Sequence, residues 1–356
     1  MTSSRNLTRE EKARYSRQIR LAEIGEEGQL KLKASSVLVI GAGALGCIVL
    51  QYLTAAGIGT IGIVDNDWID VSNLHRQVLY DISDISKPKI LASRARLERL
   101  NPEVKFNTYF LRLNKDNAAD IIKEYGIIID CTDNFATRYL INDVCVLLNK
   151  PLVYGAILQF SGQVMVLNYR NGPTLRCLFP DPPHPLEVPS CAEAGVIGSI
   201  AGIIGSIQAT EVIKMIVGAG EILSGKMLIL DSLNYSTEII AFERDPESSV
   251  VHSLGEYEDA CLSEDDSVNE ISAEDLRKML SVNPGTKVID LRDKSDPENP
   301  EFESIRIPYY EISRRPDIFT GSEPVVFWCR YGIKSRQVIN YLKKYHGRNN
   351  LYSLVI

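Results

Sequence analysis

Positive charge is scarce in this chain. Lys and Arg total 39 against 46 Asp and Glu, which gives a formal net charge of −7 at pH 7. A protein that binds nucleic acid needs a basic surface for the phosphate backbone, and no basic patch stands out in the sequence. The charge balance therefore argues against a nucleic-acid partner, while leaving room for local basic sites that hold phosphate.

Cysteine is also sparse. The seven cysteines are an odd number and are spread widely over 356 residues. Secreted proteins that depend on disulfides carry closely spaced cysteines in even numbers. The pattern is typical of cytoplasmic thiols and argues against a disulfide framework.

Long uninterrupted apolar runs are missing as well. The N-terminal residues, MTSSRNLTREEKARYSRQ, contain no apolar core of a signal peptide. The longest apolar region, residues 194–220, is interrupted by Gln208, Glu211 and Lys214, so a buried helix lined with small residues explains it better than a membrane span. We expect a cytoplasmic protein that has neither a membrane nor a nucleic acid as partner.

What is present is the composition of an ordinary globular protein, with 45% hydrophobic and 24% charged residues. The length of 356 residues allows two domains, each with its own core. Between Asp245 and Glu270 the chain has nine acidic residues and no Lys or Arg, which indicates a solvated linker. We predict a first domain over 1–245, an acidic linker over 246–270 and a second domain over 271–356.

The stretch that organises the first domain begins with a short apolar run, Val37 to Ile40, which predicts a buried parallel strand. The turn Gly41-Ala42-Gly43-Ala44-Leu45-Gly46 follows and leads into a helix that ends near Ala56. A second strand, Thr60 to Val64, ends in Asp65. This order is typical of a βαβ unit that binds a nucleotide.

Each glycine of that turn has a physical role in such a unit. Gly41 allows the tight bend, Gly43 lets a phosphate approach the backbone, and Gly46 lets the helix pack close to the sheet. Asp65 can accept hydrogen bonds from both hydroxyls of a ribose. A glycine-tolerant turn in an ordinary α/β core is the alternative interpretation.

The rest of the pattern predicts an α/β fold with a mostly parallel sheet and an antiparallel extension. Further strands are predicted at 104–110 and, as a buried strand, at 126–131, whereas 152–154, 163–169, 227–231 and 238–242 show more alternation. Beyond the acidic segment, a helix capped by Ser272 and strands at 288–290 and 325–328 predict a second, smaller α/β domain.

Charged residues near the turn decide which nucleotide is expected. Arg76, Lys89 and Arg17 accompany Asp133, which follows the buried strand at 126–131. A nicotinamide cofactor needs little positive charge, whereas attack at a phosphate of ATP needs cations for the triphosphate and a carboxylate for Mg²⁺. The GxxxxGK[ST] pattern of a P-loop ATPase is absent from the sequence. We therefore predict nucleotidyl transfer with ATP and Mg²⁺.

These motifs stand in the order of the E1-like adenylating enzymes of the MoeB/ThiF/HesA family, which the chain resembles from about Ala13 to Arg244. The resemblance is carried by Arg14-Tyr15-Ser16-Arg17-Gln18, the glycine turn, Asp65-Asn66-Asp67, Ser72-Asn73-Leu74-His75-Arg76-Gln77, Lys89 and Asp130-Cys131-Thr132-Asp133-Asn134. It implies a Rossmann-like E1-type adenylation domain. Family members activate the C-terminal Gly-Gly of a ubiquitin-like sulfur carrier (MoaD/ThiS type) as an acyl adenylate, releasing pyrophosphate, in molybdopterin and thiamine biosynthesis.

The resemblance also implies roles for single residues. Asp65 would hold the ribose, Arg76 and Lys89 the phosphates, and Asp133 the Mg²⁺ that accompanies ATP. Arg17 resembles an arginine that reaches into the site of a neighbouring subunit, which implies a homodimer. The residues that the resemblance places around the nucleotide are Gly41, Gly43, Ala44, Gly46, Asp65, Asp67, Ser72, Asn73, Leu74, His75, Arg76, Lys89, Asp133 and Asn134.

Two further features concern cysteine. Cys191 matches a family cysteine that in some members receives or exchanges the activated carboxyl or sulfur, with simple burial as the alternative. Many relatives hold a structural zinc with two CxxC pairs. Here Thr174-Leu175-Arg176-Cys177 keeps one cysteine, and Asp245-Pro246-Glu247-Ser248-Ser249 has none. Because a closed zinc site of this kind needs four thiolates, we predict no zinc.

The second domain resembles rhodanese-like domains. Cys329-Arg330-Tyr331-Gly332-Ile333-Lys334-Ser335 is similar to their active loop, and Val288-Ile289-Asp290-Leu291-Arg292 to their Asp-Val-Arg strand end. The resemblance implies a persulfide on Cys329, loaded by a cysteine desulfurase, that supplies sulfur for a thiocarboxylate on the carrier. The chain stops at Ile356, where relatives continue, so we expect a domain that is natively short or truncated.

Three other interpretations stay open. A NAD(P)-binding oxidoreductase would bind its cofactor without Mg²⁺ and release no pyrophosphate. A non-catalytic scaffold with a degenerate rhodanese-like domain is a second. An E1-like enzyme that activates another peptide or a conjugation partner is a third.

Overall fold

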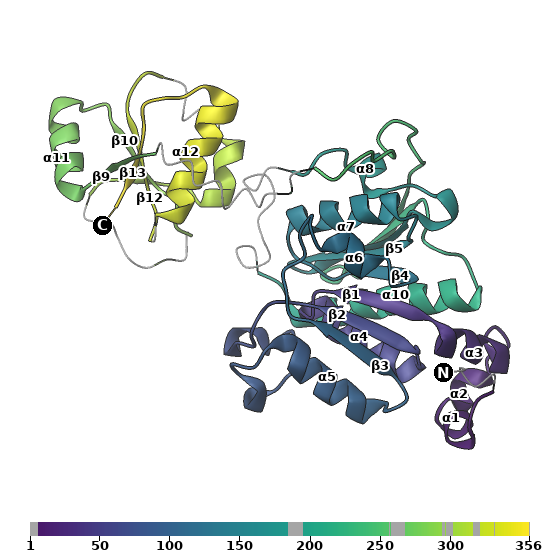
Figure 1. Ribbon diagram of the computed structural model, residues 1–356. Helices are drawn as coiled ribbons and strands as arrows, with labels where there is room; N and C mark the ends of the chain where they lie inside the picture. Colours follow the sequence, from purple (N-terminus) through teal and green to yellow (C-terminus); the bar gives the residue numbers. More distant parts are fainter. Residues whose placement is uncertain are drawn as a thin grey trace. The chain divides into compact units, whose positions relative to one another are not determined.

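The computed structural model describes residues 6–183, 195–255, 257, 268–293, 296, 302–315, 321–330 and 332–355 (Figure 1). These residues form two compact units. The N-terminal unit holds residues 6–182 and the described part of 195–257, and the C-terminal unit holds 268–355.

The N-terminal unit is built on an eight-stranded sheet with the order β3-β2-β1-β4-β5-β6-β7-β8. The strands β3, β2, β1, β4 and β5 run parallel to one another, and β6, β7 and β8 continue the sheet in antiparallel pairing. This confirms the predicted fold class. The strands are β1 (Ser36–Ile40), β2 (Thr60–Val64), β3 (Lys105–Tyr109), β4 (Ile127–Asp130), β5 (Leu152–Leu158), β6 (Ser161–Leu167), β7 (Lys226–Asp231) and β8 (Ser236–Ala241).

Helices cover both faces of this sheet (Figure 1). They are α1 (Arg9–Arg14), α2 (Ser16–Ile19), α3 (Gly25–Ala34), α4 (Ala44–Ala56), α5 (Lys89–Leu100), α6 (Ala118–Ile122), α7 (Phe135–Leu147), α8 (Leu175–Leu178) and α10 (Gly198–Val217). Short 3-10 turns lie at η1 (Val71–Asn73), η2 (Ile82–Asp84) and η3 (Tyr169–Asn171).

The central strands are apolar on both sides because each face of the sheet has its own core. Along β1, Val37 and Val39 pack into a cluster that includes residues of α4 and α10. Leu38 and Ile40 point to the opposite face, into a cluster formed with α6 and α7. A continuous apolar run in the sequence is the consequence of burial on both faces.

Helix α10 is buried, as predicted for the long apolar region. It lies against α4 and strands β5 and β6. At Gly205 an added Cβ would come within 2.8 Å of the Ile48 Cβ and 3.0 Å of the Leu45 carbonyl oxygen, so the close approach of the two helices requires glycine. Among the described helices, α10 is the one that is long and apolar enough to cross a membrane, and half of its apolar window is buried inside the unit.

The C-terminal unit contains a five-stranded parallel sheet with the order β11-β10-β12-β13-β9. Its elements are β9 (Asn269–Ile271), α11 (Ala273–Val282), β10 (Lys287–Asp290), β11 (Ile305–Arg306), η4 (Tyr309–Arg314), β12 (Val325–Trp328), α12 (Ile333–His346) and β13 (Leu351–Leu354). Ser272 caps α11 by accepting a hydrogen bond from the amide of Asp275, as predicted. The core of the C-terminal unit contains Phe327, Ile289 and Ile339.

Two parts of the segment predicted as a linker are structured. Strand β9 begins at Asn269 and pairs with β13, although the linker was predicted to reach residue 270. Nearer the middle of the segment, the Tyr257 hydroxyl donates to Asp143 on α7 at 2.6 Å. Local composition predicted solvation, but pairing with distant residues orders these parts.

Candidate functional site

The glycine turn after β1 is shaped by close backbone contacts. Gly41 has a φ of +95°, and an added Cβ would lie 2.6 Å from the Cys131 carbonyl oxygen. At Gly46 an added Cβ would lie 2.0 Å from the Gly41 carbonyl oxygen. Gly43, the N-cap of α4, is open by comparison, since a Cβ there would meet only the Gln77 Nε2 at 3.9 Å. The turn therefore leaves the backbone accessible at its middle glycine, in front of the amino end of α4.

Asp65 follows β2 directly and is tied to this turn. Its Oδ2 accepts from the amide of Ala42 at 2.7 Å, and its Oδ1 accepts from the amide of Asp67 at 2.7 Å. Burial raises the pKa of the Asp65 carboxyl above its ordinary value, and the nearby Lys89 cation offsets part of this effect. Each oxygen keeps a second acceptor position, so the carboxylate can still accept from a ligand.

Lys89 begins α5 and has a largely buried side chain, 6% exposed. Its Nζ donates to Asp67 Oδ2 at 2.8 Å, whereas the Asp67 side chain is 64% exposed. A buried cation is thus held by a carboxylate that solvent reaches. Through Asp67, the cation is connected to Asp65 and to the glycine turn.

The loop between Asp65 and α5 is organised by η1. Asp70 and Asn73 exchange hydrogen bonds around this turn. Arg76 Nη1 donates to the Ser72 carbonyl at 3.0 Å and lies 2.6 Å from His75 Nε2. The loop passes the amino end of α10, where a Cβ at Gly198 would lie 2.3 Å from the His75 carbonyl oxygen.

At the end of β4, Asp133 is exposed between two fixed neighbours. On one side, Asp130 is fully buried and accepts from the Thr132 amide and hydroxyl at 2.9 and 2.7 Å. On the other side, Asn134 caps α7 by accepting from the amide of Thr137 at 2.9 Å. The backbone around Asp133 is therefore held in place while its carboxylate faces solvent.

Arg138 supports the same segment and was not among the predicted site residues. Its guanidinium donates to the Thr132 carbonyl at 2.6 Å and to the Gly155 carbonyl at 3.0 Å, and it stacks over the Tyr154 ring at 4.6 Å. Its Nη1 lies 3.9 Å from the Oδ2 of Asp130. Burial raises the pKa of the Asp130 carboxyl above its ordinary value. An arginine on a helix is usually exposed, so no sequence pattern marks Arg138 as buried.

The parallel order of the sheet brings most of the predicted nucleotide residues to one edge. Strand β1 lies between β2 and β4, so Gly41, Asp65 and Asp133 all follow the carboxyl ends of adjacent strands. The members at this edge are Gly41, Gly43, Ala44, Gly46, Asp65, Asp67, Lys89, Asp133 and Asn134, with Ser72, Asn73, Leu74, His75 and Arg76 on the loop that leads to Lys89.

Arg17 is not part of this cluster. It is exposed on α2, and the next residue, Gln18, donates to the Ala56 carbonyl at the carboxyl end of α4. Gly43 stands at the opposite end of that helix, about 20 Å away at 1.5 Å per residue. Within one chain, Arg17 therefore lies far from the glycine turn.

The segment of Cys177, at which the family resemblance raised the question of zinc, has hydrogen bonds of its own. The Cys177 Sγ accepts from the amides of Thr174 at 3.3 Å and Asp245 at 3.4 Å. In the part of the chain that the structure describes, no group of three His, Cys, Asp or Glu side chains could hold a metal ion. These residues do not fit a zinc site of four thiolates. Cys191 lies outside the described residues.

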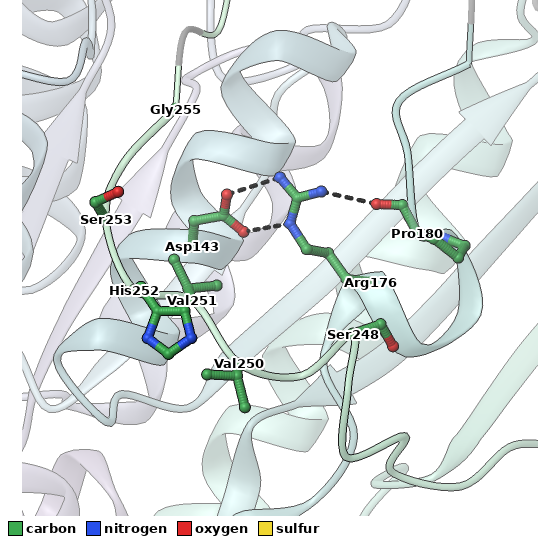
Figure 2. Close-up of a pocket in the computed structure, with 9 residues that line it drawn as sticks. All are labelled: Asp143, Arg176, Pro180, Ser248, Val250, Val251, His252, Ser253 and Gly255. Carbon is green, nitrogen blue, oxygen red and sulfur yellow. Dashed lines mark hydrogen bonds and ion pairs between the residues drawn. The ribbon is translucent and has the colours of Figure 1, made fainter.

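An ion pair closes the same region. Arg176 donates from Nε and Nη2 to the two oxygens of Asp143, each at 2.8 Å, and the Tyr257 hydroxyl donates to Asp143 as well. The pair lines a pocket of about 360 Å³, and Figure 2 shows the two side chains facing each other there. The pocket is lined by Asp143, Arg176, Pro180, Ser248, Val250, Val251, His252, Ser253 and Gly255, none of which belongs to the predicted nucleotide residues.

In the C-terminal unit, Cys329 follows β12 and is buried at 6% exposed. The loop that it opens leads to Gly332, which has a φ of +74° and is the N-cap of α12. The Cys329 Sγ lies 3.6 Å from the Ser335 Oγ on that helix. The sulfur thus lies between the end of a parallel strand and the start of a helix, where the helix dipole favours a negative charge.

Beside this loop, Asp290 ends β10 in a buried ion network. Arg292 donates to it from Nε and Nη2 at 3.0 Å, and Arg306 Nε donates to it at 3.0 Å. Burial alone would raise the pKa of Asp290, but the hydrogen bonds from Arg292 and Arg306 outweigh it, and the pKa lies below its ordinary value. The Arg292 guanidinium also stacks over the Trp328 ring at 3.9 Å.

Solved structures with a related fold include two adenylation-type neighbours by name, MccB and PaaA. The chain superposes on Escherichia coli MccB with a TM-score of 0.60 and 24% identity, over 68% of this chain and 75% of that one. It superposes on PaaA with a TM-score of 0.58 and 23% identity, over 69% of this chain and 77% of that one. At these identities the likeness shows the fold alone.

Relatives of known name match in sequence. This chain is 48% identical to the sulfur carrier protein adenylyltransferase of Thermus thermophilus, and the match covers 71% of this chain and 98% of the relative. It is 39% identical to the probable adenylyltransferase/sulfurtransferase MoeZ of Mycobacterium tuberculosis, over 95% of this chain and 90% of that relative. It is 37% identical to the adenylyltransferase and sulfurtransferase MOCS3 of Drosophila sechellia, over 98% of this chain and 82% of that relative.

A profile of the ThiF family matches residues 15–250, which include every predicted nucleotide residue. The two relatives named as sulfurtransferases also match the part of the chain that contains Cys329. The chain therefore belongs to the ThiF family and is an adenylyltransferase that carries a rhodanese-like C-terminal unit.

Proposed function

We propose that the N-terminal unit uses ATP and Mg²⁺ to adenylylate the C-terminal Gly-Gly carboxylate of a ubiquitin-like sulfur carrier of the MoaD or ThiS type. The carboxylate oxygen attacks the α-phosphorus of ATP, a P–O bond to the carrier forms, and pyrophosphate leaves. The observation that carries this proposal is the buried Lys89 cation, connected through Asp67 and Asp65 to the glycine turn.

The charges at this edge of the sheet suit that reaction. Negative charge develops on the α-phosphate and on the departing pyrophosphate, and fixed cations stabilise it most strongly where water is partly excluded. Lys89 meets this condition, and Arg76 lies on the loop that leads to it. Asp133, exposed on a rigid segment, would hold the Mg²⁺ of the nucleotide, and Asp65 would hold the ribose.

The test is ATP–pyrophosphate exchange with Mg²⁺, measured with candidate carriers that end in Gly-Gly. We expect exchange that depends on one carrier and falls by about 10²–10³ in Asp133→Ala. Asp120→Ala is the matched control, since Asp120 is an exposed carboxylate on α6 of the same unit and pairs with Lys123. No exchange with any carrier, while a short peptide supports it, would favour a peptide-activating enzyme instead.

Arg17 extends the proposal to a homodimer in which it completes the site of the partner subunit. Its position at the far end of α4 supports a role in trans. In a mixture of Arg17→Ala and Asp133→Ala chains, each inactive alone, mixed dimers regain one complete site. We expect about a quarter of the wild-type exchange rate after the subunits are allowed to reassort. A mixture that stays inactive contradicts the homodimer.

For sulfur transfer, we propose that Cys329 carries a persulfide supplied by a cysteine desulfurase. Its terminal sulfur attacks the acyl carbon of the adenylated carrier, a C–S bond forms and AMP leaves. A second thiol then cleaves the S–S bond, releases the thiocarboxylate and forms a disulfide with Cys329. Cys329→Ala should retain pyrophosphate exchange and lose thiocarboxylate formation, which mass spectrometry of the carrier detects. Full thiocarboxylation in that variant would remove Cys329 from the reaction.

We also propose that the N-terminal unit folds without structural zinc. The Asp245 amide donates to the Cys177 Sγ and so joins the two segments that two CxxC pairs would cross-link, and the Arg176–Asp143 pair ties the first of them to α7. Metal analysis of the purified protein should find no stoichiometric zinc, and a chelator should leave the thermal midpoint unchanged. One equivalent of zinc per chain would contradict this.

A further inference from the structure

Ser335 lies at the centre of a buried hydroxyl cluster beside Cys329. Its Oγ is 3.6 Å from the Cys329 Sγ, 2.8 Å from the Gly332 carbonyl oxygen and 2.7 Å from the Ser353 Oγ. Ser335 and Ser353 are both fully buried, and they come from α12 and β13. A helix and a strand thus fix one hydroxyl oxygen against the sulfur.

The directions of these hydrogen bonds follow from how many protons each group has. A serine hydroxyl has one proton to donate and two positions at which to accept. Ser335 donates its proton to the Gly332 carbonyl. It must therefore accept from the Ser353 hydroxyl and from the Cys329 thiol, which fills both acceptor positions. In this state every proton of the cluster is used, and the sulfur is a donor.

Loss of the thiol proton changes the sulfur from a hydrogen-bond donor to an acceptor. A thiolate, or the anion of a persulfide, can only accept, so the Ser335 proton has to turn from Gly332 towards sulfur. The Gly332 carbonyl still accepts from the amide of Arg336 at 3.2 Å, and therefore keeps a partner. The Ser353 hydroxyl continues to donate to Ser335 and holds its oxygen in place. Rotation about one C–O bond is the only change that this step demands of the side chains.

We propose that Ser335 is a positioning residue that switches from acceptor to donor when Cys329 ionises, and that Ser353 holds it in register. This inference rests on the proposed sulfur chemistry of Cys329. It explains why two polar hydroxyls are buried in a small apolar core next to the sulfur, where a serine without a partner would destabilise the unit. A purely structural cap of α12 is the competing account of the bond to Gly332.

Thiol alkylation tests the switch without requiring sulfur transfer. The full chain is treated with iodoacetamide over a range of pH, and the modified Cys329 peptide is quantified by mass spectrometry. We expect Ser335→Ala to slow alkylation about tenfold near neutral pH and to move the midpoint of its pH profile upward, because a hydrogen bond to a charged sulfur is lost. Ser335→Thr keeps a hydroxyl and should restore most of the rate.

Two further variants separate the switch from folding. Ser353→Ala should slow alkylation less than Ser335→Ala, since it removes the support and leaves the donor. Ser281→Ala, on the exposed side of α11, should have no effect. A Ser335→Ala variant whose pH profile is unchanged would overturn the proposal, and so would equal slowing in Ser335→Ala and Ser335→Thr. If wild-type protein shows no sulfur transfer although the alkylation results hold, the proposed function fails and the switch stands.

Discussion

Asp65 and Asp290 occupy equivalent places in the two units, yet their surroundings are opposite. Each stands at the carboxyl end of a parallel strand, β2 or β10. Asp65 accepts from two backbone amides, and burial raises its pKa. Asp290 accepts from two arginine side chains, and its pKa is lowered despite burial. The first carboxylate keeps part of its charge uncompensated, whereas the second is neutralised within the fold.

The difference shows how a ligand site can be told from a structural one. At the N-terminal site, charges are held by partners that solvent reaches, as the exposed Asp67 holds the buried Lys89. In the C-terminal unit, Arg292 and Asp290 are both buried and paired with each other. The proposed nucleotide site would be completed by its ligand, while the charges around Asp290 are already paired with each other. Substitutions at the two sites should therefore separate loss of function from loss of stability.

The largest expected effect on stability comes from Asp290→Asn. It leaves buried arginine charge without its main partner, and breaking a buried pair should lower the free energy of unfolding of the C-terminal unit by about 3 kcal/mol. The chain has two tryptophans, one in each unit, so a Trp68→Phe background reports the C-terminal unit through Trp328 fluorescence. Pyrophosphate exchange by the N-terminal unit should be unchanged. An unfolding transition equal to that of the background protein would show that Asp290 is not structural.

Much of the N-terminal fold could be predicted because local patterns determine it. Strand β1 was predicted at 37–40 and is found at Ser36–Ile40, and β2 was predicted with its observed bounds, Thr60–Val64. Burial on both faces makes such strands continuously apolar, which is a strong local signal. The glycine turn and Asp65 were likewise predicted, because three glycines at this spacing and a carboxylate after the next strand are typical of a nucleotide-binding βαβ unit.

What the sequence could not predict depends on partners distant in the chain. Lys89 was predicted as a phosphate ligand, but its ion pair with Asp67, 22 residues earlier, was not. Arg138 contacts two carbonyls that only the folded sheet brings together. Tyr257 falls in an acidic segment that predicts solvation, and its hydrogen bond to Asp143 joins residues 114 apart. Periodicity contains no information about such pairs.

The largest expected effect on activity comes from Lys89→Met. A neutral side chain of similar length keeps the packing of α5 but removes the buried cation, so pyrophosphate exchange should fall by about 10²–10³. The thermal midpoint should change little, since the partner Asp67 is exposed. Lys87→Met is the matched control. Lys87 lies only two residues before Lys89, but its side chain is exposed and pairs with Asp84. Normal exchange in Lys89→Met would remove the cation from the mechanism.

The two carboxylates should also respond oppositely to pH. Because the folded pKa of Asp290 is lowered, its contribution to stability is present above the ordinary carboxyl pKa and is lost as pH falls through the folded value. The folded pKa of Asp65 is raised, so its contribution is present at low pH and is lost as pH rises. The gap between Asp290→Asn and wild type should therefore shrink from pH 7 to about pH 3 in urea unfolding followed through Trp328. A gap that is constant with pH would contradict the assignment.

The smallest expected change in stability comes from Asp65→Asn. The substitution removes a buried charge and keeps one acceptor for the amides of Ala42 and Asp67, so these effects oppose each other and the free energy of unfolding should change by less than about 1 kcal/mol. ATP binding should nevertheless weaken about tenfold or more, because a charged acceptor for the ribose is lost. Titration calorimetry with ATP gives the affinity, and unfolding followed through Trp68 in a Trp328→Phe background gives the stability. A loss of stability as large as that of Asp290→Asn, with ATP affinity retained, would reverse the distinction between the two carboxylates.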